Sequence, residues 1–133
     1  MVIKSKKILS EISAGELIDK ISILEIKLEK IKNKASQDEI NKEYNILNEV
    51  QNSSIEMTEK LKTLLKEIKE VNLNLWNIED KLRICEKNND FGQNFIKLAR
   101  DVYLNNDKRS KIKSKINEVL GSNIKEIKQY VDY

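Results

Sequence analysis

The residues with the clearest chemical potential form a row along one flank of a predicted helix. They recur at steps of four and three within the stretch NLNLWNIEDKLRICE, and they are Asn72, Trp76, Glu79, Arg83 and Glu86. Residues at this spacing share one face of an α-helix. Because the row runs beside an apolar seam, we expect it to face the gap to a neighbouring helix, where a Trp and an Arg could line a polar groove for a ligand. The simpler interpretation is a Trp that covers the edge of the core, surrounded by ordinary ion pairs such as Glu79 with Arg83.

A second row of charges lies on the helix predicted near the N-terminus. It consists of Glu16, Lys20 and Lys27, along one flank of that helix's apolar seam. If the two flanks face each other, the lysines could meet the two glutamates of the first row, and its arginine could meet Glu16. The result would be either a ladder of ion pairs or a groove in which surplus positive charge binds a phosphate or carboxylate.

The run LARDVYLNNDKRSKIKSK contains the remaining candidates. Arg100 and Tyr103 are three residues apart on one helix face. A basic patch with no acid among its members follows, formed by Lys108, Arg109, Lys111, Lys113 and Lys115. These side chains could hold nucleic-acid phosphates, but no aromatic or Gly-rich element accompanies them, so a solvated helix face is the better interpretation.

The scarcity of some residue types narrows the chemistry. Only three of the 25 basic residues are Arg, and in such a chain an Arg suggests a need for planar, bidentate hydrogen bonding that Lys does not meet. The chain has no His, and its one Cys, Cys85, lies on an apolar seam, so catalytic triads and the usual zinc sites are excluded. Glu79 and Asp80 are adjacent and point about 100° apart on a helix, so they cannot share a metal as an i,i+4 pair can. We expect no metal and no cofactor.

Charge and composition limit the classes of protein that fit the sequence. The net charge of +3 is too small to indicate by itself binding to nucleic acid or a membrane surface. A single Cys cannot form an internal disulfide, and no apolar run is long enough for a signal peptide or a membrane span. A cytoplasmic protein is expected.

Helix start signals and apolar periodicity place the candidate residues on helices. A capping box at residues 13–16, Ser-Ala-Gly-Glu, predicts a helix over about 14–33. A second box at 36–39 predicts a shorter helix, and a third at 53–56 begins the longest element of the chain.

This longest helix, about 55–87, has the strongest periodicity. Its seam keeps alternating steps of four and three at Met57, Leu61, Leu64, Ile68, Val71, Leu75, Ile78, Leu82 and Cys85. A helix of that length spans roughly 45 Å and needs partners along all of it. Shorter helices are predicted from Phe91, from a cap at Asn106 and over 124–131, and residues 1–12 are interpreted as an extended or disordered arm.

These elements predict a single all-α domain over residues 1–133. We expect a helical bundle with one long, central, coiled-coil-like helix, about 55–87, packed antiparallel against the N-terminal helix, about 14–33. Because so long a seam would be exposed in one chain, a homodimer is also expected.

The motifs resemble those of a known family. The runs ISAGELIDKISILEIKLEKI, LWNIEDKLRICE and FIKLARDVYLNNDKRSKIKSKIN resemble a functionally uncharacterised family of small helical proteins from bacteria and their phages. The family signature falls here on Gly15, Glu16, Leu17, Asp19, Lys20, Ile23, Leu24, Ile26 and Lys27. The resemblance implies a helical fold and no particular activity.

The leading hypothesis is a non-enzymatic helical module that binds a partner protein or an anionic small ligand through a polar groove. Its candidate residues are Glu16, Lys20, Lys27, Asn72, Trp76, Glu79, Arg83, Glu86, Arg100 and Tyr103. One alternative is a small bundle enzyme that acts on a phosphorylated or carboxylated metabolite, with Lys20, Arg83 and Arg100 as an anion clamp. LIDKISILEIKLEKI is loosely similar to the first helix of chorismate mutase bundles, although the Arg usual in that helix is missing. A second alternative is weak nucleic-acid binding through residues 108–115.

Overall fold

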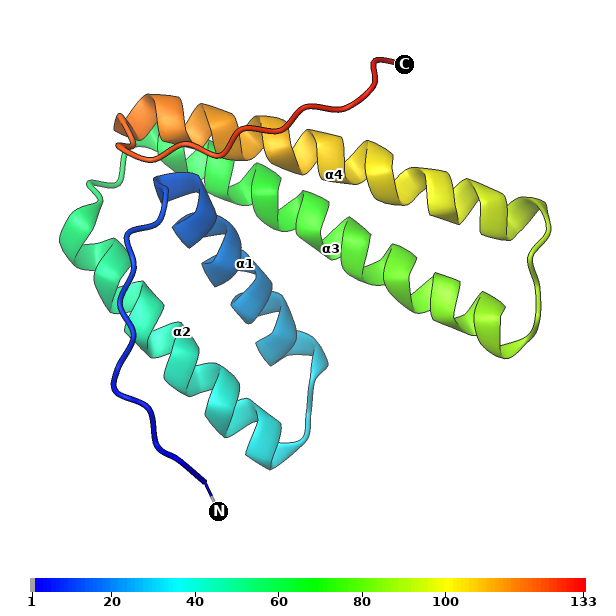
Figure 1. The fold of residues 1–133 in the computed structure, drawn as a ribbon, viewed down its shortest axis with the longest axis horizontal. Coiled ribbons are helices and arrows are strands. Elements are labelled where there is room, and N and C mark those ends of the chain that lie inside the picture. Colours follow the sequence, from blue (N-terminus) through cyan, green and yellow to red (C-terminus); the bar gives the residue numbers. More distant parts are fainter. Residues whose placement is uncertain (1) are drawn as a thin grey trace.

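The computed structural model describes residues 2–133 as two helical hairpins. Their helices are α1 (Ala14–Lys30), α2 (Lys34–Ser54), α3 (Glu59–Lys87) and α4 (Gln93–Leu120). Helix accounts for 72% of the described residues and no strand occurs among them, so the predicted all-α class is confirmed. Figure 1 shows that the α1–α2 and α3–α4 hairpins meet at one end of the molecule and diverge towards the other. None of the described helices combines the length and apolar composition needed to cross a bilayer.

The apolar core lies where α1, α3 and α4 meet. Its buried side chains are Ile18, Leu61, Leu64, Ile68, Val71, Ile112 and Ile116. The four members on α3 belong to the predicted seam. The main chain of α1 comes close to each of the other three helices, whereas the main chain of α2 comes close to α1 alone, and α2 has no buried residue.

The prediction of one long central helix is wrong, because the helices pack together as a bundle. Helix α3 begins at Glu59 rather than near 55, since Thr58 caps it by accepting a hydrogen bond from the Leu61 amide. Helix α4 is nearly as long, with 28 residues against 29, because the two helices predicted on either side of Asn106 are continuous. An Asn can cap a helix but does not require one to start, and here Asn106 lies half-buried against a cavity.

The predicted direction of the first helix is also wrong. Figure 1 shows that α1 and α3 start at the same end of the molecule and run the same way. The reason is α2, which was expected to be short but has 21 residues against 17 in α1. It starts early because Asn33 caps it, accepting a hydrogen bond from the Ser36 amide. A full-length α2 returns the chain to the end where α1 began, so α3 must start there.

Both ends of the chain lack helix. Residues 2–12 are exposed and form no regular structure, and Met1, which the predicted arm includes, lies outside the described residues. The helix predicted over 124–131 does not form: α4 ends at Gly121, which has a φ of 59°, and the rest of the chain runs back along α4 (Figure 1). Its apolar residues find little surface to bury, and short helices depend on such burial.

The expectation of a homodimer relied on an uncovered seam along the long helix. In the structure the seam residues Leu61, Ile68 and Cys85 are all buried within one chain. Helix α4 covers α3 along its length (Figure 1), so the argument from an exposed seam no longer applies. Association of two copies stays a prediction.

The N-terminus of α1 is held closely against α4. Ser13 caps α1 as predicted, accepting a hydrogen bond from the Glu16 amide at 3.1 Å. The Gly15 amide donates to the Asn117 side-chain oxygen at 2.7 Å, and the Ala14 amide donates to the Ser122 hydroxyl at 3.1 Å. The free amides of this helix end are therefore satisfied by side chains of the same chain.

Gly15 permits this close contact. A Cβ atom added at Gly15 would lie 2.6 Å from the main-chain oxygen of Lys113, and a main-chain atom can yield only if the helix moves. We predict that Gly15→Ala lowers the free energy of unfolding by about 1–3 kcal/mol, because the overpacking outweighs the better helix propensity of Ala. Urea unfolding would measure the loss.

Gly92→Ala is the control for this variant. A Cβ there would meet only a carboxylate oxygen of Asp90 at 3.5 Å, so the expected loss is under about 1 kcal/mol, the size of a weakened helix cap. A Gly15→Ala protein as stable as the parent would show that α1 and α4 do not approach so closely.

Candidate functional site

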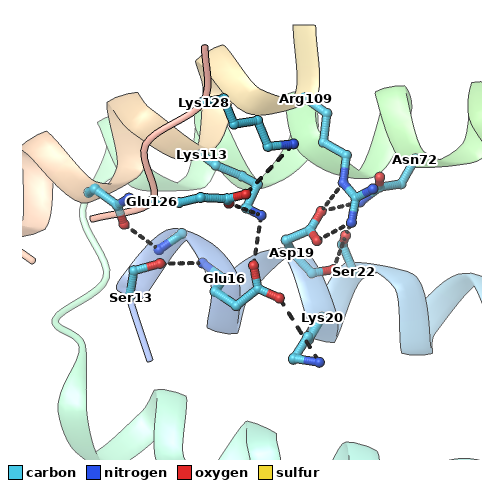
Figure 2. A network of polar contacts seen from close by, with 12 residues as sticks. Ser13, Glu16, Asp19, Lys20, Ser22, Asn72, Arg109, Lys113, Glu126 and Lys128 are labelled. Carbon is cyan, nitrogen blue, oxygen red and sulfur yellow. Dashed lines mark hydrogen bonds and ion pairs between the residues drawn. The ribbon is translucent and has the colours of Figure 1, made fainter. Parts of the chain in front are cut away.

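A buried polar network joins the three core helices beside the apolar core. Asp19 of α1 is 1% exposed and forms a bidentate ion pair with Arg109 of α4, whose Nε and Nη2 atoms lie 2.8 Å and 2.5 Å from the two carboxylate oxygens. Asn72 of α3 donates from Nδ2 to the same carboxylate at 2.9 Å. Figure 2 shows the three side chains converging from three helices.

The hydroxyl of Ser22 completes this cluster. It accepts the second hydrogen of Asn72 Nδ2 at 2.8 Å and donates to the main-chain oxygen of Asp19 at 2.8 Å. No fully buried side-chain nitrogen or oxygen among the described residues lacks a hydrogen-bond partner. A buried network is stabilising when it is satisfied in this way.

A second cluster ties α1 to α4 and to the C-terminal segment. Lys113, whose side chain is 10% exposed, donates to Glu16 at 2.7 Å and to Glu126 at 3.0 Å (Figure 2). Lys20 lies 4.0 Å from the other carboxylate oxygen of Glu16. The ammonium of Lys113 is therefore held between carboxylates from two segments.

These contacts shift the ionisation of the buried groups. Burial alone would raise the pKa of Asp19, but the hydrogen bonds from Arg109 and Asn72, with the charge of Arg109, outweigh it and bring the pKa below its ordinary value. Burial would lower the pKa of Lys113, but the hydrogen bonds to Glu16 and Glu126 raise it overall. The contacts therefore favour the charged forms of Asp19 and Lys113.

A cavity of about 360 Å³ opens beside the Asp19 cluster, and we call it the Trp76 cavity. It lies between α1, α3 and α4, and it is lined by Ile23, Ile26, Asn72, Leu75, Trp76, Glu79, Asp80, Asn106 and Arg109. Its apolar side chains come from α1 and α3, and its polar side chains come from α3 and α4.

The structure brings some of the predicted groove residues together here. Asn72, Trp76 and Glu79 line the Trp76 cavity, together with Arg109, which was predicted as part of the basic patch. Arg83 does not line it; its exposed side chain pairs with the carboxylate of Glu79 one turn away.

The other predicted groove residues lie elsewhere. Glu16 and Lys20 belong to the Lys113 cluster, and Lys27 and Glu86 form no ion pair within residues 2–133. Arg100 is exposed on α4, and Tyr103 packs edge-on against Tyr133, with ring centroids 5.8 Å apart. The ladder of ion pairs, one of the two outcomes considered for these rows, does not form among residues 2–133, because Glu16 and Lys20 pair with each other and with Lys113, and Glu79 pairs with Arg83.

The five predicted basic-patch residues do not face the same way. Arg109 and Lys113 point inward to carboxylates of α1, whereas Lys108, Lys111 and Lys115 are exposed. Only these three could contact nucleic-acid phosphates without breaking a buried ion pair.

Sequence reasoning overlooked the residue at the centre of the network. Asp19 was not among the predicted groove residues, yet it is almost fully buried. The signal that could have found it was the rarity of Arg, since Arg109 makes the bidentate contact that this rarity suggested. Nothing in the local pattern of α1 identified its partner, which lies 90 positions along the chain.

Comparisons with known proteins give one match. A family model described as "Family of unknown function (DUF6165)" matches residues 8–132. No curated protein and no solved structure matches the chain.

The first prediction from this site concerns the buried ion pair. Arg109→Met should lower the free energy of unfolding by about 3 kcal/mol or more, because it leaves the buried charge of Asp19 without its partner. Asp19→Leu should lower it by less, because the Arg109 side chain that is left behind is 28% exposed and reaches water. The double variant should lose less than the sum of the two, since it leaves neither charge behind. Urea unfolding of the parent, the two single variants and the double variant measures the coupling energy between Asp19 and Arg109. Strictly additive losses in unfolding free energy would show that the two residues are not coupled.

The second prediction concerns pH. The pKa of Asp19 is lower in the folded chain, so its contribution to stability is complete above the ordinary Asp value of about 3.9 and is lost as the pH falls towards the folded value. Asp19→Asn mimics the protonated side chain. Its deficit in unfolding free energy relative to the parent should therefore be largest near pH 7 and shrink below about pH 4. A deficit independent of pH would show that the charge of Asp19 does not matter.

Proposed function

We propose that this chain, which belongs to the family of unknown function (DUF6165) as its motifs predicted, is a non-enzymatic helical module. In this proposal it binds a ligand group in the Trp76 cavity. The group belongs to a partner protein or to a small molecule. The cavity, rather than the whole row of charges predicted from the sequence, is the binding surface in this proposal.

The observation that carries the proposal is the position of the only Trp. Trp76 is half-buried at a cavity whose apolar side is formed by Ile23, Ile26 and Leu75. Concave sites with an apolar lining and a few polar groups are typical of ligand binding, and a volume of about 360 Å³ is sufficient for a small molecule or a side chain.

The Asp19 network supports the proposal because it fixes the walls of the cavity. Asn72 and Arg109 are members of both. Their side chains are locked by charge-assisted hydrogen bonds to Asp19, so they do not need to be ordered when a ligand binds.

The placement of the cations favours binding over catalysis. The alternative enzyme needs Lys20, Arg83 and Arg100 together as an anion clamp. All three are exposed, and none lines the Trp76 cavity. The metabolite-binding enzyme is therefore less well supported than the binding module.

The proposal is tested by fluorescence, because emission of the protein's one Trp reports directly on the cavity. We expect that one class among nucleotides, sugar phosphates, small carboxylates, alkylamines and short charged peptides gives a saturable change in Trp76 emission. The same class should raise the melting temperature, since binding to the folded state adds about 2.7 kcal/mol at a hundredfold excess over Kd.

Two variants complete the test. Trp76→Phe should remain folded and lose most of the ligand-induced shift in melting temperature, while Lys111→Gln, exposed on another part of α4, should keep it. If no class changes Trp76 emission at millimolar concentration, the cavity is not a binding site.

A further inference from the structure

The charges around the Trp76 cavity do not suit the anionic ligand expected from the sequence. Two carboxylates line it, those of Glu79 and Asp80, and one cation, Arg109. The charge of Arg109 is offset by its bidentate contact with Asp19, and Glu79 shares its charge with Arg83. Asp80 forms no ion pair within residues 2–133, so the cavity carries surplus negative charge.

The side-chain oxygen of Asn72, in the cavity wall, accepts no hydrogen bond from the described residues. Asn72 is 5% exposed, and both hydrogens of its Nδ2 are taken by Asp19 and Ser22. Every fully buried side-chain oxygen among the described residues has a hydrogen-bond partner, so the Asn72 Oδ1 atom is not fully buried. Because Asn72 lines the Trp76 cavity, the cavity is where this oxygen is accessible.

The orientation of the Asn72 amide follows from its neighbour. A carboxylate accepts hydrogen bonds and cannot donate them, so Asp19 holds Nδ2 towards itself. The opposite rotation would place Oδ1 against the negative charge of Asp19. The carbonyl oxygen is therefore presented to the cavity, and a ligand group that meets it must be a hydrogen-bond donor.

The remaining wall suits a cation on an apolar stem. Trp is the side chain that best attracts a cation placed over its ring, and Ile23, Ile26 and Leu75 supply a surface for methylene groups. Within about 360 Å³ an alkyl chain with a charged end fits more readily than a nucleotide.

From these observations we infer that the ligand group of the Trp76 cavity is a primary alkylammonium, the end of a lysine side chain or of an aliphatic amine. Its N–H groups bond Asn72 Oδ1 and the carboxylate of Asp80, and its stem lies against Trp76 and the two isoleucines. This inference rests on the proposed function and specifies the ligand. A phosphate or carboxylate would instead meet Asp80, Glu79 and the bare oxygen of Asn72, and its one counter-charge in the lining, Arg109, is already paired with Asp19.

The test is a titration of Trp76 emission with four probes of similar length. They are Nα-acetyl-lysine amide, its trimethylated form, 1,5-diaminopentane and pentanoate. We expect the two primary amines to bind and pentanoate not to bind. The trimethylated form should bind at least about tenfold more weakly, because it has no N–H for Asn72 Oδ1. A higher affinity for Nα-acetyl-lysine amide than for 1,5-diaminopentane would identify a protein side chain as the source of the ammonium group. A higher affinity for the diamine would identify a free amine.

Two exposed residues provide variants that change the charge in opposite directions without touching the buried network. Asp80→Asn should weaken amine binding about tenfold, and Arg83→Gln should strengthen it several-fold because it releases Glu79. Lys111→Gln should leave binding unchanged.

Three results would overturn the inference. The first is pentanoate or inorganic phosphate as the better ligand at Trp76, in which case the proposed function stands and its ligand is an anion. The second is binding insensitive to Asp80→Asn, and the third is equal affinity for the trimethylated probe. A Trp76 signal that no probe and no other class of ligand changes would overturn the proposed function as well.

Discussion

The arrangement of α1, α3 and α4 depends on one carboxylate, that of Asp19, which lies in the interior with its charge intact. Removing such a group from water costs several kcal/mol, and the cost is offset only by partners with good geometry. Arg109 and Asn72 provide these partners from two other helices. A slip of α1 by one turn, about 5.4 Å, would separate the carboxylate from both, so the pair selects one register among the many that apolar packing would tolerate.

The same pair explains why a binding cavity can exist next to the core. Side chains in an open cavity are ordinarily free to change rotamer, and a ligand must then order them. Asn72 and Arg109 are already held in place by Asp19, which does not itself line the cavity. By contrast, α2 has no buried residue and its main chain comes close to α1 alone, so the stability of the chain is concentrated in the other three helices.

How much of this could be read from the sequence differs from element to element. Local signals were sufficient where one residue decides the outcome, as with Ser13 at the start of α1. They failed where packing decides, as at Asn106, which has the residue type of a helix cap but lies inside α4. The flank row on α3 led to Asn72, Trp76 and Glu79 at one cavity, because periodicity fixes which residues share a face. It could not show that Arg109 joins them, since that depends on how α4 lies against α3.

The contact between the start of α1 and the end of α4 has a further consequence. The Ala14 amide and the Ser122 hydroxyl are separated by 108 positions in the chain but lie 3.1 Å apart. The helical body thus enters and leaves at nearly the same point, with Glu11 and Asn123 also in contact beside it. A unit whose two ends lie together can be inserted into a loop of another protein without forcing the ends of that loop apart. It can also be circularly permuted, with its present ends joined and new ends made in another loop. The four helices could therefore follow one another along the chain in other circularly permuted orders and still pack in the same way.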